Sequence, residues 1–499
     1  MGYTIKFILL LGLLLAGEAI WAQSEAIRLS KARERAGASR THSLLHHNDD
    51  FFYVLRTDAR FTYAEFETYD SSLNFLRASD IAPKHERKYS GALNVVGNIY
   101  LLSLQYKHDA EKDIYEGVRF VAYPVDTTTM QLREDSILLV EPFRMESNYY
   151  RGNFAISPDR SKILLYDYEE KGDIEELPGL TNVVTLRVFD NQLRLLWKRR
   201  VDLAPNSTAQ RMVVLKKFRI NNNGTVAILT DVFRADAPRT YLTKTVSVDP
   251  TLFFVGREEE EFLRYTPQLG DFFYSQSDFA FDRRGHIHWV GCYSTERYHL
   301  QGGIFYLQLN ASCTRVVLKK RHAFSPELIA ATLARRKPSE KRQLRDFKLA
   351  SWRIHPQTNE LTIALECQPP ATYNFKSHQL LLLRLDTLGD MRWATPLQKW
   401  GDVGESYATF LSHYLCVQGD YAYVMYNDGI YENNRAFVAR FDSSGNMQRR
   451  MLFRYDEQQD LLCPRLSYPV GEQIFICLQT RFFKQHRFGL LDLRTLFKQ

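Results

Sequence analysis

Short runs of aliphatic and aromatic residues recur along the whole chain, with polar turns between them. Runs of about five to eight residues with this composition, joined by turns, are typical of antiparallel β-strands. The aromatic content of 13% favours the same structure, because aromatic side chains fit the half-buried surface of a sheet. The pattern therefore predicts an all-β protein.

The first of two repeated turn signals is a Gly or polar residue that precedes an apolar run, as in VGNIYLLSLQY. Copies recur at intervals of about sixty residues, which indicates an internal repeat. They fall at Gly97, Arg160, Gly224, Gly285, Asn359, Gly419 and Gly471, and a weaker copy precedes FFYVLRT at residues 48–50.

The second signal is an Asp or Asn directly after an apolar strand, in phase with the first signal. Such a side chain accepts a hydrogen bond from a backbone N–H two residues further on, so it predicts that the chain reverses there. The copies are Asp70, Asp126, Asp190, Asp249, Asn310, Asp386, Asp442 and Asp492.

Three or four strands in each unit of about sixty residues predict a β-propeller of seven or eight blades. The eight acidic turns favour eight blades, and the seven strong Gly-type turns favour seven. The last unit ends soon after Asp492, so a segment after Gln23, either EAIRLS or HSLLHH, would supply its missing strand. Two β-sandwiches of roughly 220 residues each are the weaker alternative, since no Pro/Gly/Ser-rich linker divides the chain.

The N-terminus has the features of a secretory signal peptide. Lys6 precedes the apolar segment Phe7–Gly17, and Ala22 stands at a suitable cleavage site. An uncleaved anchor is the alternative, although this segment is too short to span a bilayer. We expect residues 1–22 to be a signal peptide, 23–47 an N-terminal segment with a possible ring-closing strand, and 48–499 the propeller. The protein is then exported to the periplasm, the cell surface or the medium, with no transmembrane segment in the mature chain.

The longest gap between turn signals holds a basic insertion, residues 319–345. Ser325 followed by Pro326 predicts the start of a short helix. The insertion has nine Lys or Arg against two Glu, and this excess equals the formal net charge of +7 of the whole chain. The insertion is either a solvated surface or a patch for an anionic partner. The patch residues would be Lys319, Lys320, Arg321, Arg335, Arg336, Lys337, Lys341, Arg342 and Arg345.

Ligands of propellers usually bind at one end of the central channel, where loops of several blades meet. Charged and aromatic residues that precede the innermost strands are therefore candidates for ligand binding, with blade packing as the alternative. They are Tyr149, Tyr150, Arg151, Asp271, Phe272, Tyr274, Glu405 and Tyr407.

Patterns for known chemistry are absent from the sequence. G-x-S-x-G, H-E-x-x-H, phosphate-loop and calcium-loop patterns do not occur. His286 and His288 share one strand face, with His299 nearby, but such histidines are more often structural than zinc ligands. We expect no metal and no cofactor, and no nucleic-acid partner, because the basic insertion lacks interleaved aromatic residues.

The six Cys residues all lie in the C-terminal half and form no C-x-x-C pair. Cys463 and Cys477 flank a turn, so they would face each other across one hairpin. Export makes a disulfide possible, and buried free thiols are the alternative.

The unit FAISPDRSKILLYDY, around Ser157-Pro158-Asp159, resembles the PD40 or TolB-like propeller repeat of exported bacterial proteins. The resemblance implies a fold rather than an activity, because propellers have many functions. We expect a non-enzymatic binding or scaffold module of the bacterial cell envelope, with a protein or glycan partner. The alternatives are a propeller enzyme, a hydrolase or lyase, that acts on a glycan at the channel mouth, and a subunit that docks through the basic insertion.

Overall fold

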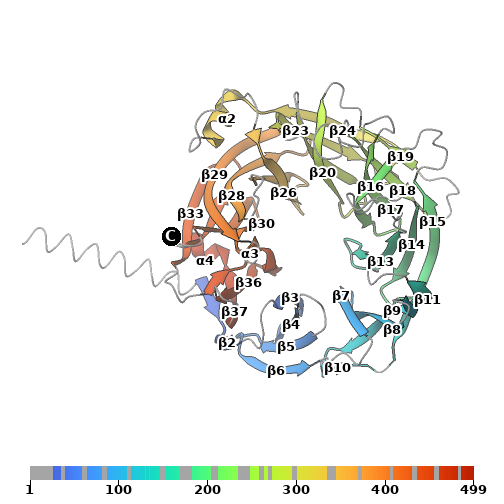
Figure 1. Cartoon of the computed structure of the whole chain (residues 1–499). Helices are drawn as coiled ribbons and strands as arrows, with labels where there is room; N and C mark the ends of the chain where they lie inside the picture. Colours follow the sequence, from blue (N-terminus) through green and yellow to red (C-terminus); the bar gives the residue numbers. More distant parts are fainter. Residues whose placement is uncertain are drawn as a thin grey trace, which may run out of the picture.

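Most of the predicted turns join two apolar strands, and the computed structural model arranges the resulting antiparallel sheets as eight blades around one axis (Figure 1). The all-β class, the propeller and the count of eight blades are thus confirmed, and two separate sandwiches are excluded. The structure describes residues 26–34, 40–58, 64–80, 87–109, 114–129, 131–133, 135–145, 153–168, 183–203, 212–233, 248–257, 263–267, 272–294, 300–333, 344–368, 374–404, 408–429, 435–454, 460–480 and 485–498.

The strands follow one another from the axis outwards in the first four blades. Blade 1 contains β3 (Arg40–His47), β4 (Phe51–Asp58), β5 (Ala64–Asp70) and β6 (Phe75–Asp80). Blade 2 contains β7 (Arg87–Val95), β8 (Asn98–Asp109), β9 (Ile114–Asp126), β10 (Gln131–Leu132) and β11 (Ile137–Met145). Blade 3 contains β12 (Asn153–Ile156), β13 (Lys162–Tyr168), β14 (Val183–Asp190) and β15 (Leu195–Asp202). Blade 4 contains β16 (Met212–Ile220), β17 (Val226–Phe233), β18 (Val248–Val255) and β19 (Leu263–Tyr265).

The next three blades have the same order. Blade 5 contains β20 (Phe273–Phe281), β21 (Ile287–Ser294), β23 (Gly303–Leu309) and β24 (Val316–Ala323). Blade 6 contains β26 (Phe347–Ile354), β27 (Leu361–Cys367), β28 (Asn374–Leu385) and β29 (Met391–Gly404). Blade 7 contains β30 (His413–Gln418), β31 (Tyr421–Asp428), β32 (Arg435–Phe441) and β33 (Met447–Arg454).

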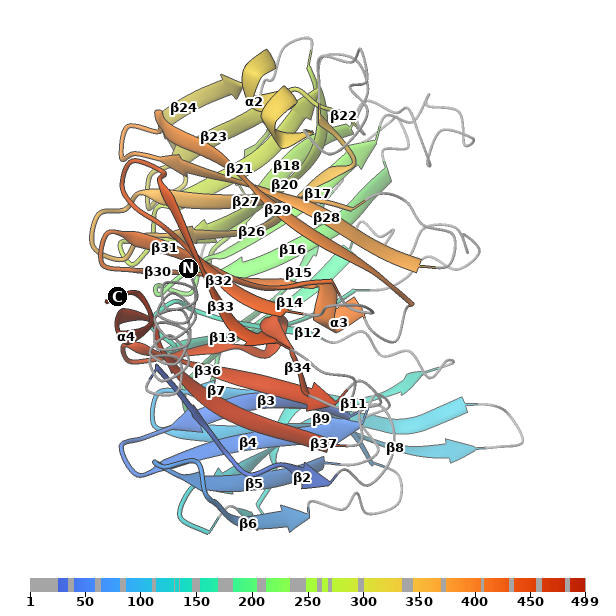
Figure 2. The same cartoon turned by 90° about the vertical axis from the view of Figure 1, so that its left-hand side faces the viewer.

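Blade 8 is built from both ends of the chain. Its C-terminal strands are β34 (Asp460–Leu462), β35 (Tyr468–Val470), β36 (Gln473–Thr480) and β37 (Gln485–Asp492). The N-terminal strands β1 (Ile27–Leu29) and β2 (Arg33–Glu34) pair antiparallel with β37 and close the ring (Figure 2). Of the two segments considered for closure, EAIRLS supplies this strand. HSLLHH lies in β3, so the first blade includes the last eight residues of segment 23–47.

The first turn signal marks the turn between the first and second strands of a blade. All seven residues at its strong copies have a positive φ, from 55° at Gly419 to 91° at Gly224. Five of the seven are glycine, which adopts this left-handed conformation without a steric penalty. Arg160 and Asn359 adopt it as non-glycine residues, with φ of 60° and 59°.

The second signal marks the turn between the third and fourth strands in most blades. Asp386 is representative, since its Oδ1 accepts from the N–H groups of Leu388 at 2.9 Å and Asp390 at 2.8 Å. The prediction is wrong at Asp249, which lies inside β18 opposite Val232. At the last copy, Asp492 instead caps the short helix α4 (Leu493–Phe497).

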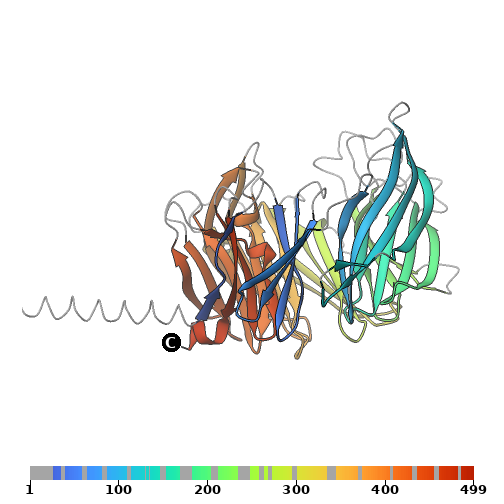
Figure 3. The same cartoon turned by 90° about the horizontal axis from the view of Figure 1, so that it is seen from below.

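Apolar side chains hold each blade against the next, as in the cluster between blades 4 and 5. Leu229 and Phe254 of blade 4 pack there with Phe279, Trp289 and Phe305 of blade 5, and all five are buried. Removing such residues from water is the main stabilising contribution that the repeat makes. Figure 3 shows the ring edge-on, with the strands running across its thickness.

The predicted insertion forms the short helix α2 (Pro326–Thr332), on the outside of the ring in Figure 1. Ser325 caps it by accepting from the backbone N–H of Leu328 at 3.2 Å, and Pro326 is its first residue. Its residues Ile329 and Thr332 are buried against the rest of the protein. In the part of the chain that the structure describes, no helix has the length and hydropathy needed to cross a membrane.

All six cysteines are buried thiols, and none of them forms a disulfide. Cys463 and Cys477 lie side by side across the hairpin, as expected, with the backbone N–H of Cys463 donating to the carbonyl of Cys477 at 2.8 Å. Of the two possibilities for this pair, the structure has the reduced one.

Candidate functional site on the propeller axis

The wall of the axis is formed by the first strand of each blade. Those of successive blades contact one another: β12 with β16, β16 with β20, β20 with β26, and β26 with β30. Because strands alternate in direction, all first-to-second turns lie at one face of the ring, and the loops between blades lie at the other. We call these the turn face and the loop face (left and right in Figure 2).

A polar chain crosses this wall through three blades. Lys217 of β16 donates to Asp278 Oδ2 of β20 at 2.5 Å, and Trp352 Nε1 of β26 donates to the same oxygen at 3.1 Å. The Lys217 side chain is 36% exposed and that of Asp278 is 22% exposed, so solvent reaches both. Three strands that are far apart in sequence are thus joined at one carboxylate.

Two guanidinium groups lie next to this chain without a carboxylate partner. Arg219 follows Lys217 on the same face of β16, and Arg353 follows Trp352 on β26. Among the described residues, neither has a carboxylate at ion-pair distance, and the buried Arg219 Nε has no hydrogen-bond partner. The pKa of Lys217 is lowered, first by burial; Asp278 opposes this, whereas Arg219 and Arg353 add to it. This part of the wall is therefore locally cationic.

The second polar group joins blades 6 and 7 nearer the loop face. Ser351 Oγ of β26 and His413 Nε2 of β30 are 2.6 Å apart. His413 Nδ1 faces Glu366 Oε2 of β27 at 3.5 Å, and Glu366 Oε1 accepts from Lys399 Nζ of β29 at 2.6 Å. Lys399 also donates to the carbonyl of Leu411, the last residue of α3 (Ala408–Leu411).

Glu366 is ionised in this arrangement although it is buried. Burial acts to raise its pKa, but the ammonium of Lys399 and the imidazole of His413 outweigh it and hold the pKa well below its usual range. Ser351, His413 and Glu366 thus stand in the order hydroxyl, imidazole and carboxylate that is found around serine nucleophiles, with His413 Nδ1 at ion-pair distance from Glu366 and without a hydrogen bond to it.

At the turn face, residues of three further blades meet close to the axis. The guanidinium of Arg160, in the first turn of blade 3, donates to the hydroxyl of Tyr468 in blade 8. His46 and His47, at the end of β3, have a lowered pKa, chiefly because of burial, and Arg160 lowers both further. This cluster adds another cation to the axial wall.

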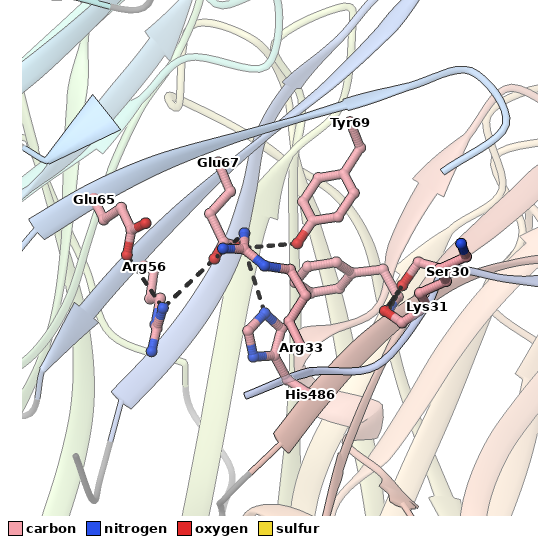
Figure 4. A network of polar contacts seen from close by, with 9 residues as sticks. Ser30, Lys31, Arg33, Arg56, Glu65, Glu67, Tyr69 and His486 are labelled. Carbon is pink, nitrogen blue, oxygen red and sulfur yellow. Dashed lines mark hydrogen bonds and ion pairs between the residues drawn. The ribbon is translucent and has the colours of Figure 1, made fainter. Parts of the chain in front are cut away.

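A buried network at the junction of blades 1 and 8 has a structural role (Figure 4). Glu67, which is fully buried, lies 3.0 Å from Arg33 Nη1 of β2 and 3.4 Å from His486 Nε2 of β37, and it accepts from the Tyr69 hydroxyl at 2.8 Å. Arg56 approaches it at 3.6 Å. The carboxylate therefore ties the N-terminal strand to the first and last blades.

Only two of the predicted channel-mouth residues are described, and they lie together in blade 5. The ring of Phe272 lies edge-on to that of Tyr293, with centroids 4.9 Å apart. The hydroxyl of Tyr274 is 3.1 Å from Ser277 Oγ, and burial is the first cause of its raised pKa. The remaining six lie outside the described residues and stay predictions: Tyr149, Tyr150, Arg151, Asp271, Glu405 and Tyr407.

The predicted anionic-partner patch begins on a strand rather than in a loop. Lys319, Lys320 and Arg321 belong to β24, the outer strand of blade 5. Lys320 pairs with Asp390 at 2.8 Å, and Arg321 lies over the ring of Phe272 at 4.3 Å. Arg345 lies in β25 (Leu344–Arg345), which pairs with β22 (Leu300–Gln301). The residues outside the described part are Arg335, Arg336, Lys337, Lys341 and Arg342, and the patch stays a prediction.

His286 and His288 share a carboxylate rather than an open metal site. Their ring nitrogens lie 3.1 and 3.3 Å from Asp282 Oδ2, and His288 Nδ1 is 2.9 Å from the Tyr306 hydroxyl. His299 lies outside the described residues. Over the described ranges, no group of three or more His, Cys, Asp or Glu residues is placed to hold a metal ion.

Sequence reasoning missed Ser351, His413, Glu366, Lys217 and Arg353. Each is a polar residue in a largely apolar strand, and strands of different blades bring them together. The sequence signal that could have found them is a charged residue at a position where the alternation of the strand predicts a buried apolar one. Such a residue needs a partner in the folded protein. Glu405 and Tyr407 were predicted as ligand-binding residues and come directly before α3 in the sequence. They are close in sequence to His413, but the prediction did not include His413 itself.

Comparison with known proteins gives structural similarity only. No family model matches the sequence, and no curated protein matches it. The polysaccharide lyase Uly1 is 11% identical, with a TM-score of 0.38 over 83% of this chain and 91% of the lyase. A Lactobacillus plantarum protein is 10% identical, with a TM-score of 0.34 over 82% of this chain and 95% of that one. A Galerina marginata prolyl oligopeptidase B is 8% identical, with a TM-score of 0.40 over 88% of this chain and 55% of its own.

Proposed function

We propose that this protein is an exported propeller that binds an anionic ligand at its axis, beside Arg219 and Arg353. The observation that carries the proposal is the pair of guanidinium groups near Lys217 that have no carboxylate partner among the described residues. Partly buried cations are normally paired in proteins, so the half-buried Arg219 is an incentive for an anion to bind, and the exposed Arg353 adds a second cation that the anion can reach.

The chemistry of the two side chains suits a carboxylate or phosphate group. A guanidinium presents parallel N–H donors that match two oxygens of such a group, and charge-assisted bonds of this kind are the strong ones. Asp278 is the nearby carboxylate on the wall, and Lys217 and Trp352 already engage it. These contacts offset the negative charge of Asp278, so it should repel an incoming anion only weakly.

Export and the repeat type belong to the same proposal. The apolar segment Phe7–Gly17 followed by Ala22 supports export. The turn around Ser157 supports a PD40-like repeat, since Ser157 Oγ accepts from the backbone N–H of Lys162 at 2.9 Å and donates to Asp159 at 2.6 Å. An acidic glycan is the ligand class to test first, because an exported protein meets such glycans at the cell surface.

Isothermal titration of the chain from Gln23 with tetragalacturonate tests the proposal, with maltotetraose as the neutral probe. We expect binding of the acid and none of the neutral sugar. Arg353→Gln should lower the affinity for tetragalacturonate by about 10- to 100-fold, which is the scale of one charge-assisted hydrogen bond. Arg450→Gln, on the exposed outer strand β33, removes the same charge elsewhere and should bind as the wild type does. Equal weakening by both variants would contradict an axial site.

A further inference from the structure

We propose that Ser351, His413 and Glu366 form an acyl-transfer centre that hydrolyses esters at the loop-face side of the axis. The geometry carries the proposal. Ser351 Oγ is 2.6 Å from His413 Nε2, and His413 Nδ1 faces Glu366 Oε2 at 3.5 Å. The three groups stand in the order that lets an imidazole remove a hydroxyl proton while a carboxylate stabilises the imidazolium.

The surroundings favour a reactive hydroxyl over a passive contact. Ser351 is partly exposed, whereas the side chains of His413 and Glu366 are only 4% and 5% exposed. Ser351 is thus the most exposed of the three residues, and the general base and the carboxylate lie deeper in the protein. Glu366 is held in place by Lys399 at 2.6 Å and by the amide of Gln368 at 3.0 Å, so the carboxylate does not have to reorganise during the reaction.

Ser351 lies on β26, the innermost strand of blade 6, and therefore close to the axis. Residues 351 and 353 follow the β-bulge between Leu349 and Ser351, so Ser351 and Arg353 point to the same side of β26. Ser351 therefore lies two residues along β26 from Arg353, whose guanidinium has no carboxylate partner among the described residues. This places an acidic group of the substrate next to the bond to be cleaved, and that choice of substrate rests on the proposed function.

The reaction balances with water as the co-reactant. Ser351 Oγ attacks the ester carbonyl carbon while its proton passes to His413 Nε2. The carbon–oxygen bond to the alcohol breaks, and the alcohol leaves with that proton. Water then attacks the acyl group on Ser351 and gives a proton to His413 Nε2. The carboxylic acid departs as this proton returns to Ser351 Oγ. Glu366 touches only the imidazole, so it is a positioning residue.

The test is covalent labelling of the whole mature chain with a fluorophosphonate, with the modified residue located by tandem mass spectrometry. We expect one label per chain, on Ser351, without any variant being needed. Ser351→Ala and His413→Ala should abolish labelling, whereas Ser444→Ala, in an exposed turn of blade 7, should leave its rate unchanged. Glu366→Gln should move the acid limb of the pH–rate profile of labelling to lower pH, which a purely structural role would not do.

A second measurement separates this inference from the proposed function. The rates of hydrolysis of mono-p-nitrophenyl succinate and p-nitrophenyl butyrate are compared in the wild type and in Arg353→Gln. A preference for the succinate that Arg353→Gln removes supports both proposals. No label on Ser351 in a chain that binds tetragalacturonate overturns the acyl-transfer centre alone. A label on Ser351 with equal rates for both esters and no binding of the acid overturns the anion site alone.

Discussion

Ser30 and Phe488 exchange two hydrogen bonds, although the two residues lie at opposite ends of the chain. The backbone N–H of Ser30 donates to the carbonyl of Phe488 at 2.8 Å, and the N–H of Phe488 donates to Ser30 Oγ at 3.0 Å. Because each blade is stabilised by its neighbours, the ring is complete only when the N-terminal strand joins blade 8. The two ends of the chain therefore stabilise each other.

Removing the closing strands should destabilise the whole ring. A chain that begins after Glu34 lacks β1 and β2 and exposes the edge of β37, whereas a chain that begins at Ala26 retains them. We expect the shorter chain to lose about 3 kcal/mol of unfolding free energy, the scale of one or two buried apolar side chains. Urea unfolding followed by fluorescence measures the difference. Equal midpoints for the two chains would show that closure contributes nothing.

Glu67→Gln should destabilise the protein, because it leaves Arg33 and Arg56 beside a neutral amide. Breaking a buried ion pair in this way costs about 3 kcal/mol at neutral pH. The matched control is Glu472→Gln, whose partner Arg494 and carboxylate are 64% and 66% exposed, and which should change stability by less than about 0.5 kcal/mol. Equilibrium unfolding in urea compares the two variants, and equal effects would contradict the assigned role of Glu67.

The same carboxylate gives a pH dependence of defined sign. Burial acts to raise the pKa of Glu67, but His486, Arg33 and Tyr69 together hold it below the ordinary 4.5. A pKa lowered on folding contributes stability in full above the unfolded value and loses it as pH falls through the folded value. The unfolding free energy should therefore fall more steeply below pH 4.5 in the wild type than in Glu67→Gln. Parallel curves would show that this group does not supply the slope.

The acidic turns should depend on the side-chain oxygen rather than on the charge. Asp386→Ala removes two hydrogen bonds to backbone N–H groups and should cost about 1 kcal/mol or more. Asp386→Asn keeps the accepting oxygen and should stay close to the wild type. Thermal unfolding of the pair tests this, and a loss of stability in Asn as large as in Ala would assign the effect to charge instead.

Thiol accessibility tests the state of the cysteines. All six are buried, and Cys463 and Cys477 are 0% and 1% exposed. Burial raises the pKa of Cys292 and Cys416 to about 12, so both stay protonated and unreactive at neutral pH. We expect almost no reaction with Ellman's reagent in the folded protein and six thiols after denaturation. Four thiols in the denatured chain would show that one pair is a disulfide.

The repeat could be predicted from the sequence because residues within each turn, chiefly Gly and Asp, determine its conformation. Gly97, Gly285 and their equivalents were predicted as turns and have positive φ, and Asp386 and Asp442 accept the expected backbone bonds. Asp249 carried the same signal but lies within β18, since the residue type alone does not show where a strand ends. Leu73 and Leu193 also have positive φ in buried turns, which no propensity would have suggested.

The candidate site could not be predicted from the sequence, because its residues come from different blades. Ser351 and His413 are 62 residues apart, and neither has a partner within its own strand. Their proximity follows from β26 and β30 lying next to each other around the axis, which depends on the number of blades and on their register. Arg219 and Arg353 lie on strands of different blades, and only the closed ring places both near Lys217.

A crystal structure of the chain from Gln23 soaked with tetragalacturonate would show directly whether an anion binds at the axis. We predict a carboxylate of the acid within hydrogen-bond distance of Arg219 or Arg353, with Asp278 still bound to Lys217. It would be contradicted by acid bound elsewhere with none at the axis, or by carboxylates of the chain itself paired with both guanidinium groups.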